Sequence, residues 1–120
     1  MGPVMQIICQ RHMVAAFAAG GLLAVIFDLP SYGASQHLIS QKGQAFSPAE
    51  IAIQRGEKLR ILNDDGDLRH HAYIDSEKLS FDSGDQEPGS QTEIAFPSLG
   101  DFTVLCAIHP KMKLVVHVRK

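Results

Sequence analysis

A strong net charge is the first thing that this sequence lacks. Its 120 residues include 11 basic and 13 acidic side chains, which gives a formal net charge of -2. The basic residues are scattered along the chain rather than gathered in one run. Proteins that bind nucleic acid usually present a basic patch or stripe, so the charge pattern argues against a nucleic-acid partner. The length allows one small domain.

Long hydrophobic runs are also scarce, and the main one lies near the start of the chain. Residues 13–27 are largely apolar, follow the polar pair Arg11-His12 and precede the small residues of 31–35. This order is typical of a secretory signal peptide. We therefore expect residues 1–34 to be a signal peptide and residues 35–120 to form an exported, periplasmic domain. The alternative is a retained membrane anchor, although the run is short for a span of about 20 residues.

Cysteine is the third scarcity, because the chain has only Cys9 and Cys106. Removal of the signal peptide would take Cys9 away and leave Cys106 without a disulfide partner. A lone thiol is chemically vulnerable in an oxidising compartment unless something occupies it. A buried, inert cysteine is one explanation. His109 and Met112, three and six residues further on, favour metal ligation instead.

These three side chains offer a thiolate, an imidazole and a thioether within seven residues. Soft sulfur ligands with imidazole select copper, and a trigonal His2Cys set with a weak axial Met is the blue-copper arrangement. The missing histidine is His70 or His71. We favour His70 because it shares the inward parity of Ala72 and Ile74 in an alternating strand. A site whose ligands all come from the protein leaves no position for substrate, which indicates electron transfer rather than an enzyme.

Alternation of apolar and polar residues predicts strands through most of residues 35–120. No helical period or repeat is visible, so we expect an all-β, antiparallel sandwich of about seven to eight strands. The segment 76–90 is an irregular connection with one short strand. Val104 and Cys106 share one face, and Met112 starts the inward face of the last strand, so both sulfur atoms should point into one end of the core. The predicted strand segments are 46–54, 59–63, 70–75, 92–96, 102–106 and 112–118.

The Asp64–Asp67 segment is predicted to be a solvated turn, because the alternate spacing of a calcium loop is absent. The sequence also lacks a serine nucleophile motif of the hydrolase type. The sequence therefore indicates neither calcium binding nor hydrolase activity.

Several of these features together resemble the cupredoxins of the plastocyanin and azurin family. The resemblance rests on Asn63, the His70-His71 pair, the approach strand 100–106 and the Cys-x-x-His-Pro-x-Met loop, whose length is most similar to that of amicyanin. It covers about residues 46–118. It implies a Greek-key sandwich that binds one copper ion per chain through four side chains, namely His70, Cys106, His109 and Met112.

The resemblance also implies roles outside the ligand set. Asn63 would tie the upstream ligand loop to the cysteine loop, and the apolar residues around His109 would form a docking patch for redox partners. Those partners could be an amine dehydrogenase and a c-type cytochrome, and the mature protein would be a monomer with no membrane contact. We expect a periplasmic blue copper protein that carries single electrons. The alternatives are an exported copper-binding protein for copper handling or storage, and a cupredoxin-like structural domain that holds no metal.

Overall fold

The computed structural model describes Gly20, Gly21 and residues 36–120, and the regular structure within these residues is entirely β-strand. The predicted signal peptide, residues 1–34, lies outside the described residues apart from the two glycines. No helix in the described part of the chain is long and apolar enough to cross a membrane. The nine strands are β1 (Gln36–Lys42), β2 (Ala45–Ser47), β3 (Glu50–Gln54), β4 (Lys58–Asn63), β5 (Ala72–Asp75), β6 (Ser80–Asp82), β7 (Gln91–Ala95), β8 (Gly100–Cys106) and β9 (Lys113–Arg119).

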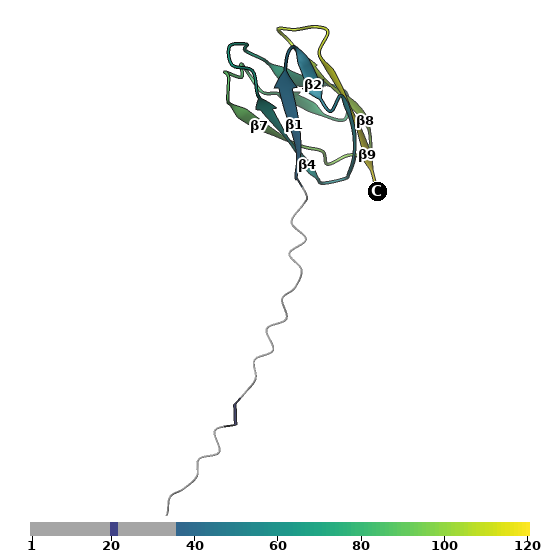
Figure 1. Ribbon diagram of the computed structural model, residues 1–120. Coiled ribbons are helices and arrows are strands. Elements are labelled where there is room, and N and C mark those ends of the chain that lie inside the picture. The colour runs from purple at the N-terminus through teal and green to yellow at the C-terminus, as the bar shows by residue number, and fades with distance from the viewer. Residues whose placement is uncertain (1–19, 22–35) are drawn as a thin grey trace, which may run out of the picture. The chain divides into compact units, whose positions relative to one another are not determined.

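The strands form two sheets that pack as a sandwich (Figure 1). One sheet has the order β2-β1-β4-β7, and the other has the order β3-β9-β8-β5-β6. The predicted all-β sandwich is therefore confirmed. The expected antiparallel pairing is wrong for two pairs of strands, because β1 runs parallel to β4 and β3 runs parallel to β9.

Two differences from the predicted strands concern the beginning of the domain. Strand β1 was not predicted, and the segment 46–54 is divided between β2 in one sheet and β3 in the other. Pro48 stands between the two strands. Proline lacks the N–H that a central ladder needs, so the chain can leave the first sheet there and cross to the second. Both parallel pairs arise from this early part of the chain.

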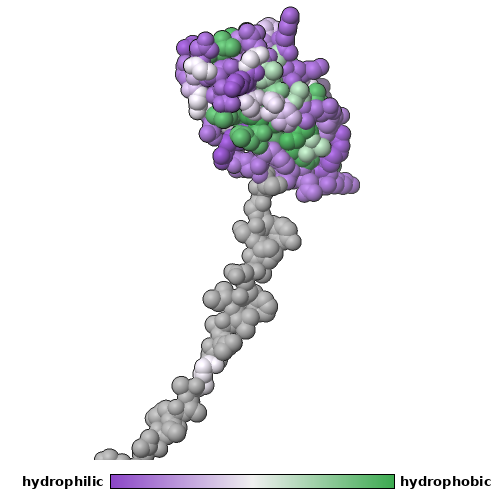
Figure 2. All heavy atoms as spheres, in the orientation of Figure 1, coloured by the Kyte–Doolittle hydropathy of each residue, from purple (hydrophilic) through white to green (hydrophobic). Residues whose placement is uncertain are grey.

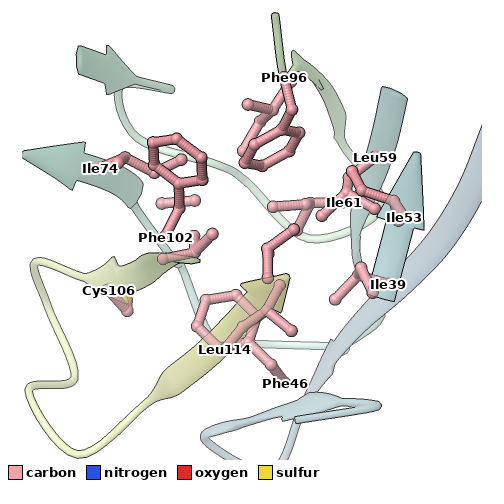
Figure 3. Packing of buried hydrophobic residues seen from close by; sticks show 14 of the residues in the cluster. Ile39, Phe46, Ile53, Leu59, Ile61, Ile74, Phe96, Phe102, Cys106 and Leu114 are labelled. Atoms are coloured by element: carbon pink, nitrogen blue, oxygen red, sulfur yellow. The ribbon is translucent and has the colours of Figure 1, made fainter. Parts of the chain in front are cut away.

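The core lies between the two sheets and is built from the inward residues of the alternating strands (Figure 3). In β8, Phe102, Val104 and Cys106 are at most 3% exposed, as the alternation predicts. In β9, the same holds for Leu114, Val116 and Val118. The short strand β6 confirms the single strand expected within 76–90, and Phe81 from it packs against the core. Because β8 and β9 pair in antiparallel fashion, the C-terminal end of β8 and the start of β9 lie at the same end of the sandwich. The alternation of the two strands turns the same kind of face inward in both.

The outer surface is mainly polar, with a smaller apolar area on the face that Figure 2 shows. His117 lies on the outward side of β9, as expected, and bridges Glu50 of β3 and Asp101 of β8 at 2.5 and 2.8 Å. The hydrogen bonds to Glu50 and then to Asp101 raise the pKa of His117. Two large apolar side chains of the described residues are exposed: Leu38 at 58% and Ile108 at 43%.

Candidate metal centre

Two strand ends, a short loop and an isolated bridge meet at one end of the sandwich. Cys106 is the last residue of β8, and Met112 directly precedes β9. His109 lies in the loop between them. His70 comes from the segment before β5, where it forms an isolated antiparallel bridge with Gln86. Ala72 pairs with Cys106, so the β5–β8 ladder places the upstream histidine next to the cysteine.

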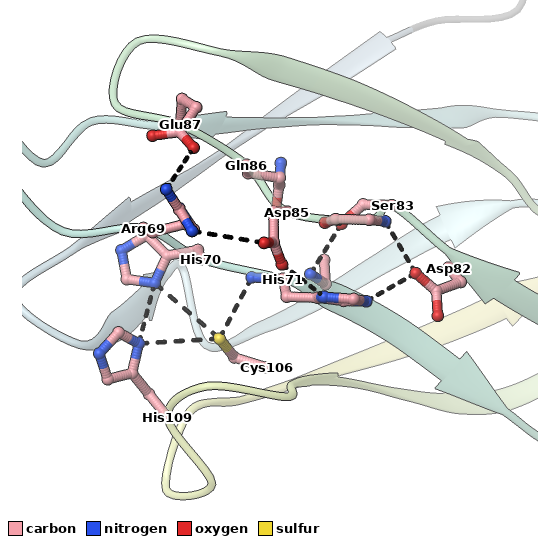
Figure 4. A network of polar contacts seen from close by, with 12 residues as sticks. Arg69, His70, His71, Asp82, Ser83, Asp85, Gln86, Glu87, Cys106 and His109 are labelled. Atoms are coloured by element: carbon pink, nitrogen blue, oxygen red, sulfur yellow. Dashed lines mark hydrogen bonds and ion pairs between the residues drawn. The ribbon is translucent and has the colours of Figure 1, made fainter.

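The three side chains His70, Cys106 and His109 form a compact cluster (Figure 4). The Cys106 Sγ atom lies 3.9 Å from His70 Nδ1 and 3.7 Å from His109 Nδ1. The two Nδ1 atoms are 3.2 Å apart. His70 and Cys106 are buried, whereas His109 is partly exposed. The cluster therefore has a closed inner side and an accessible edge at His109.

These separations fit a metal ion held by all three atoms. Metal bonds of about 2.0 Å to imidazole nitrogen and about 2.3 Å to thiolate sulfur place neighbouring ligand atoms about 3 to 4 Å apart at angles near trigonal. The observed separations of 3.2, 3.7 and 3.9 Å are in this range. Two imidazoles and one thiolate are donors that suit copper. Among the described residues, this is the only cluster of histidine, cysteine and acidic side chains with such spacing.

His71 lies apart from this cluster, and its ring points toward acidic residues (Figure 4). Its Nδ1 and Nε2 atoms lie 3.1 and 2.6 Å from the carboxylates of Asp85 and Asp82. Partial burial lowers the pKa of His71, but the hydrogen bonds to Asp85 and Asp82 more than offset it, so the pKa is raised overall. A histidine whose two ring nitrogens are both engaged with acids is a poor metal ligand. Strand parity thus separates adjacent histidines into a buried cluster member and a surface residue.

The main chain of His71 nevertheless contacts the cluster. Its N–H lies 3.4 Å from Cys106 Sγ, and its carbonyl accepts a hydrogen bond from the N–H of Ala107 at 2.9 Å. The sulfur atom therefore has a main-chain donor within reach, and the thiolate is the form of cysteine that binds metal. The pair of contacts also fixes the start of the cysteine loop against the upstream histidine segment.

Met112, the predicted fourth donor, directly precedes β9 and lies inside the sandwich. Its side chain is 1% exposed and belongs to the core, as the parity of β9 predicts. Its N–H donates a 2.9 Å hydrogen bond to the carbonyl of His109, which closes the loop tightly. The predicted role of Met112 as a weak axial ligand is compatible with this burial and stays a prediction.

Asp65 is a residue near the cluster that sequence reasoning missed. Its Oδ2 atom lies 2.5 Å from His70 Nε2, and its side chain is 10% exposed, whereas the sequence predicted only a solvated turn. Because a carboxylate can only accept, Nε2 carries the proton and Nδ1 presents its lone pair to the cluster. The hydrogen bond from the Gly43 main chain, against some desolvation, and then the contact with His70 keep the pKa of Asp65 below its ordinary value. The aspartate is therefore ionised at neutral pH.

Asn63 has a different role from the one that the resemblance implied. Its Nδ2 atom donates to the carbonyls of Leu68 and Gln86, each at 2.8 Å, and its Oδ1 accepts from the N–H of Asp65. These partners belong to the loop before His70 and to the connection before β7. Asn63 thus braces the upstream histidine from behind, while the main chain of His71 makes the contact with the cysteine.

The accessible edge of the cluster opens into a shallow hollow at the surface. The apolar residues around His109 are exposed, as expected from the sequence. A residue of the β1–β2 turn, Gln44, completes the rim. The hollow is lined by Gln44, Ile108, His109, Pro110 and Lys111.

The amino-acid sequence matches no protein-family model and no curated protein. Solved structures are similar to it in three dimensions. A copper-containing nitrite reductase from Thermus scotoductus SA-01 has 25% sequence identity and a TM-score of 0.66, over 72% of this chain and 23% of the reductase. The chain thus spans less than a quarter of that enzyme.

Two smaller proteins match over most of their own length. A variant of amicyanin in its Cu(I) form has 14% identity and a TM-score of 0.65, over 70% of this chain and 82% of amicyanin. A purple cupredoxin from Nitrosopumilus maritimus has 22% identity and a TM-score of 0.60, over 69% of this chain and 99% of that protein. At such identities the likeness shows the fold alone.

Proposed function

We propose that this chain, which has the cupredoxin fold, is a blue copper protein that carries single electrons between redox partners. The observation that supports this most directly is the cluster of His70, Cys106 and His109, whose donor atoms all lie within 4.8 Å of one another. We propose these three residues and Met112 as the ligands of one copper ion. Copper bound there would supply a one-electron Cu(I)/Cu(II) couple.

The residues around the site suit electron transfer better than catalysis. His70 is held by Asp65 and Cys106 by the β5–β8 ladder, so the donors are fixed before any metal arrives. Fixed donors change little between two oxidation states, which favours rapid electron exchange. The buried sides of the site exclude water, and only the edge at His109 reaches the surface. We also propose that residues 1–34 direct export to the periplasm.

Spectroscopy of the copper-loaded full chain tests the proposal. We expect an intense visible charge-transfer band, a blue-copper EPR signal and reversible one-electron redox. The band should vanish in Cys106→Ser, because it requires the thiolate. Colourless binding of Cu(I) without reversible oxidation would support copper handling instead, and failure to bind copper would contradict both functions.

We propose the hollow beside His109 as the docking surface for redox proteins such as a c-type cytochrome or an amine dehydrogenase. Ile108 is 43% exposed there, and weak redox encounters use small interfaces of this kind. Lys111 supplies a positive charge at the rim, which would favour an acidic partner surface.

Lys111→Glu should therefore slow electron transfer to an acidic c-type cytochrome by about tenfold at low salt, because a rim charge acts mainly on association. Stopped-flow kinetics measures the rate. Lys78→Glu is the matched control, since this exposed lysine lies near Gly100, at the other end of β8. Equal rates for the two variants would contradict docking at the hollow.

A further inference from the structure

The Asp65 carboxylate is held on both of its oxygen atoms. Oδ2 accepts the His70 Nε2–H at 2.5 Å, and Oδ1 accepts the N–H of Gly43, in the turn between β1 and β2, at 3.0 Å. The N–H of Asp65 itself donates to Asn63 Oδ1 at 3.1 Å. The His70 side chain is fully buried and that of Asp65 is 10% exposed. The contact is therefore largely buried and supported by main-chain hydrogen bonds, unlike an ion pair on the surface.

The contact lies on the side of the imidazole that faces away from the donor cluster. His70 directs Nδ1 at Cys106 and His109 while Nε2 faces Asp65. A carboxylate that accepts from the second nitrogen of a ligand histidine fixes the tautomer and ring orientation and makes the first nitrogen more basic. A negative charge behind the ring also stabilises a dication more than a monocation.

We propose that Asp65 is a positioning residue that holds His70 toward the metal and stabilises the oxidised site relative to the reduced site. This inference rests on the proposed copper site. Its consequence is a reduction potential lower than the same four ligands would give without the carboxylate. The Asp64–Asp67 turn thus has a part in the redox chemistry.

The contact between Asp65 and His70 is not needed merely to hold the loop 64–69 in place. Asn63 already ties this loop to the main chain at Leu68 and Gln86. The adjacent residue, Asp64, is exposed, and its main-chain N–H donates a hydrogen bond to the carbonyl of Gln41. Of the three neighbours Asn63, Asp64 and Asp65, only Asp65 places a side-chain charge against the imidazole.

The test compares Asp65→Asn with Asp64→Asn in the copper-loaded full chain. Both variants remove one negative charge, one residue apart, and asparagine keeps an oxygen acceptor in place. We expect Asp65→Asn to remain blue and to lose about tenfold in affinity for Cu(II) relative to Cu(I), since outer partners of a metal ligand are typically worth about 10- to 100-fold. A tenfold change in a one-electron couple raises the potential by about 59 mV. Asp64→Asn should shift the potential by much less.

The ring protons of His70 provide a second readout, which a purely structural role would not move. In the wild-type protein, NMR should show a strongly hydrogen-bonded, slowly exchanging Nε2–H, and in Asp65→Asn this proton should move upfield and exchange faster. Equal potential shifts in the two variants, or a wild-type His70 without a protected Nε2–H, would overturn the inference. If Asp65→Asn fails to fold, the presence or absence of a protected His70 Nε2–H in the wild-type protein decides for or against the inference.

The wild-type signal can also be measured without metal. If the wild-type chain binds no copper, the proposed function fails. The metal-free NMR spectrum still shows whether Asp65 sets the His70 tautomer, so the two failures are distinguishable.

Discussion

Replacing His70 by alanine should abolish the blue copper spectrum, whereas replacing His71 by alanine should leave it almost unchanged. His70 directs Nδ1 into the cluster, 3.2 Å from His109 Nδ1. Loss of a ligand should weaken copper binding by more than about 100-fold, because even outer-shell partners are worth about 10- to 100-fold. Visible absorption and EPR during copper titration measure both effects.

His71→Ala is the matched control because the two residues are adjacent and chemically identical. The His71 ring contacts Asp82 and Asp85, so its removal should affect only the surface. Its hydrogen bond to Cys106 comes from the main chain and survives the substitution. A blue His70→Ala protein, or a colourless His71→Ala protein, would show that the ligand assignment is wrong.

Phe96→Ala should lower the free energy of unfolding by about 3 to 5 kcal/mol, the usual cost of deleting a buried aromatic side chain. Phe96 is fully buried, and its ring centroid lies 5.7 Å from that of Phe102 at a tilt of 56°. Its carbonyl accepts from the N–H of Gly56, before β4 begins. Figure 3 shows the ring well away from Cys106. The folded variant should therefore keep the copper spectrum of the wild type.

Urea denaturation of the metal-free protein measures the loss. Phe81→Ala is the control, because this phenylalanine is only partly buried on the edge strand β6 and should cost less. Destabilisation of the two variants by the same amount would contradict the view that the core between the sheets dominates stability. A changed copper spectrum in Phe96→Ala would mean that the site depends on packing at the far end.

The strands nearest the site were predictable because their sequences alternate cleanly. One face of β8 and one face of β9 carry large apolar residues, and a period of two leaves only one way to bury them. The same parity predicted that His70 and Met112 would be buried and that His71 would lie on the other face. The number and direction of the strands were less predictable.

Strand β1 shows why. Of its two large hydrophobic residues, Leu38 is 58% exposed and Ile39 is fully buried, and the polar Gln41 is buried on the same face as Ile39. The parallel ladder with β4 decides which face points inward, because it pairs Ile39 with Ile61 and Gln41 with Asn63. A local pattern carries no information about a partner that lies about twenty residues away along the chain.

By itself, the sequence determined which candidate donor side chains lie close together and which way the neighbouring strands face. A thiol, an imidazole and a thioether lie within seven residues, and alternation fixes the faces of the strands on either side, since both features are local. Only the tertiary structure decided how the site is closed and charged. It brought His70 to Cys106 through the β5–β8 ladder and turned Asp65, but not Asp64, onto the imidazole. Turn composition cannot specify such a choice, because the hydrogen bond from Gly43 and the burial of His70 come from elsewhere in the fold.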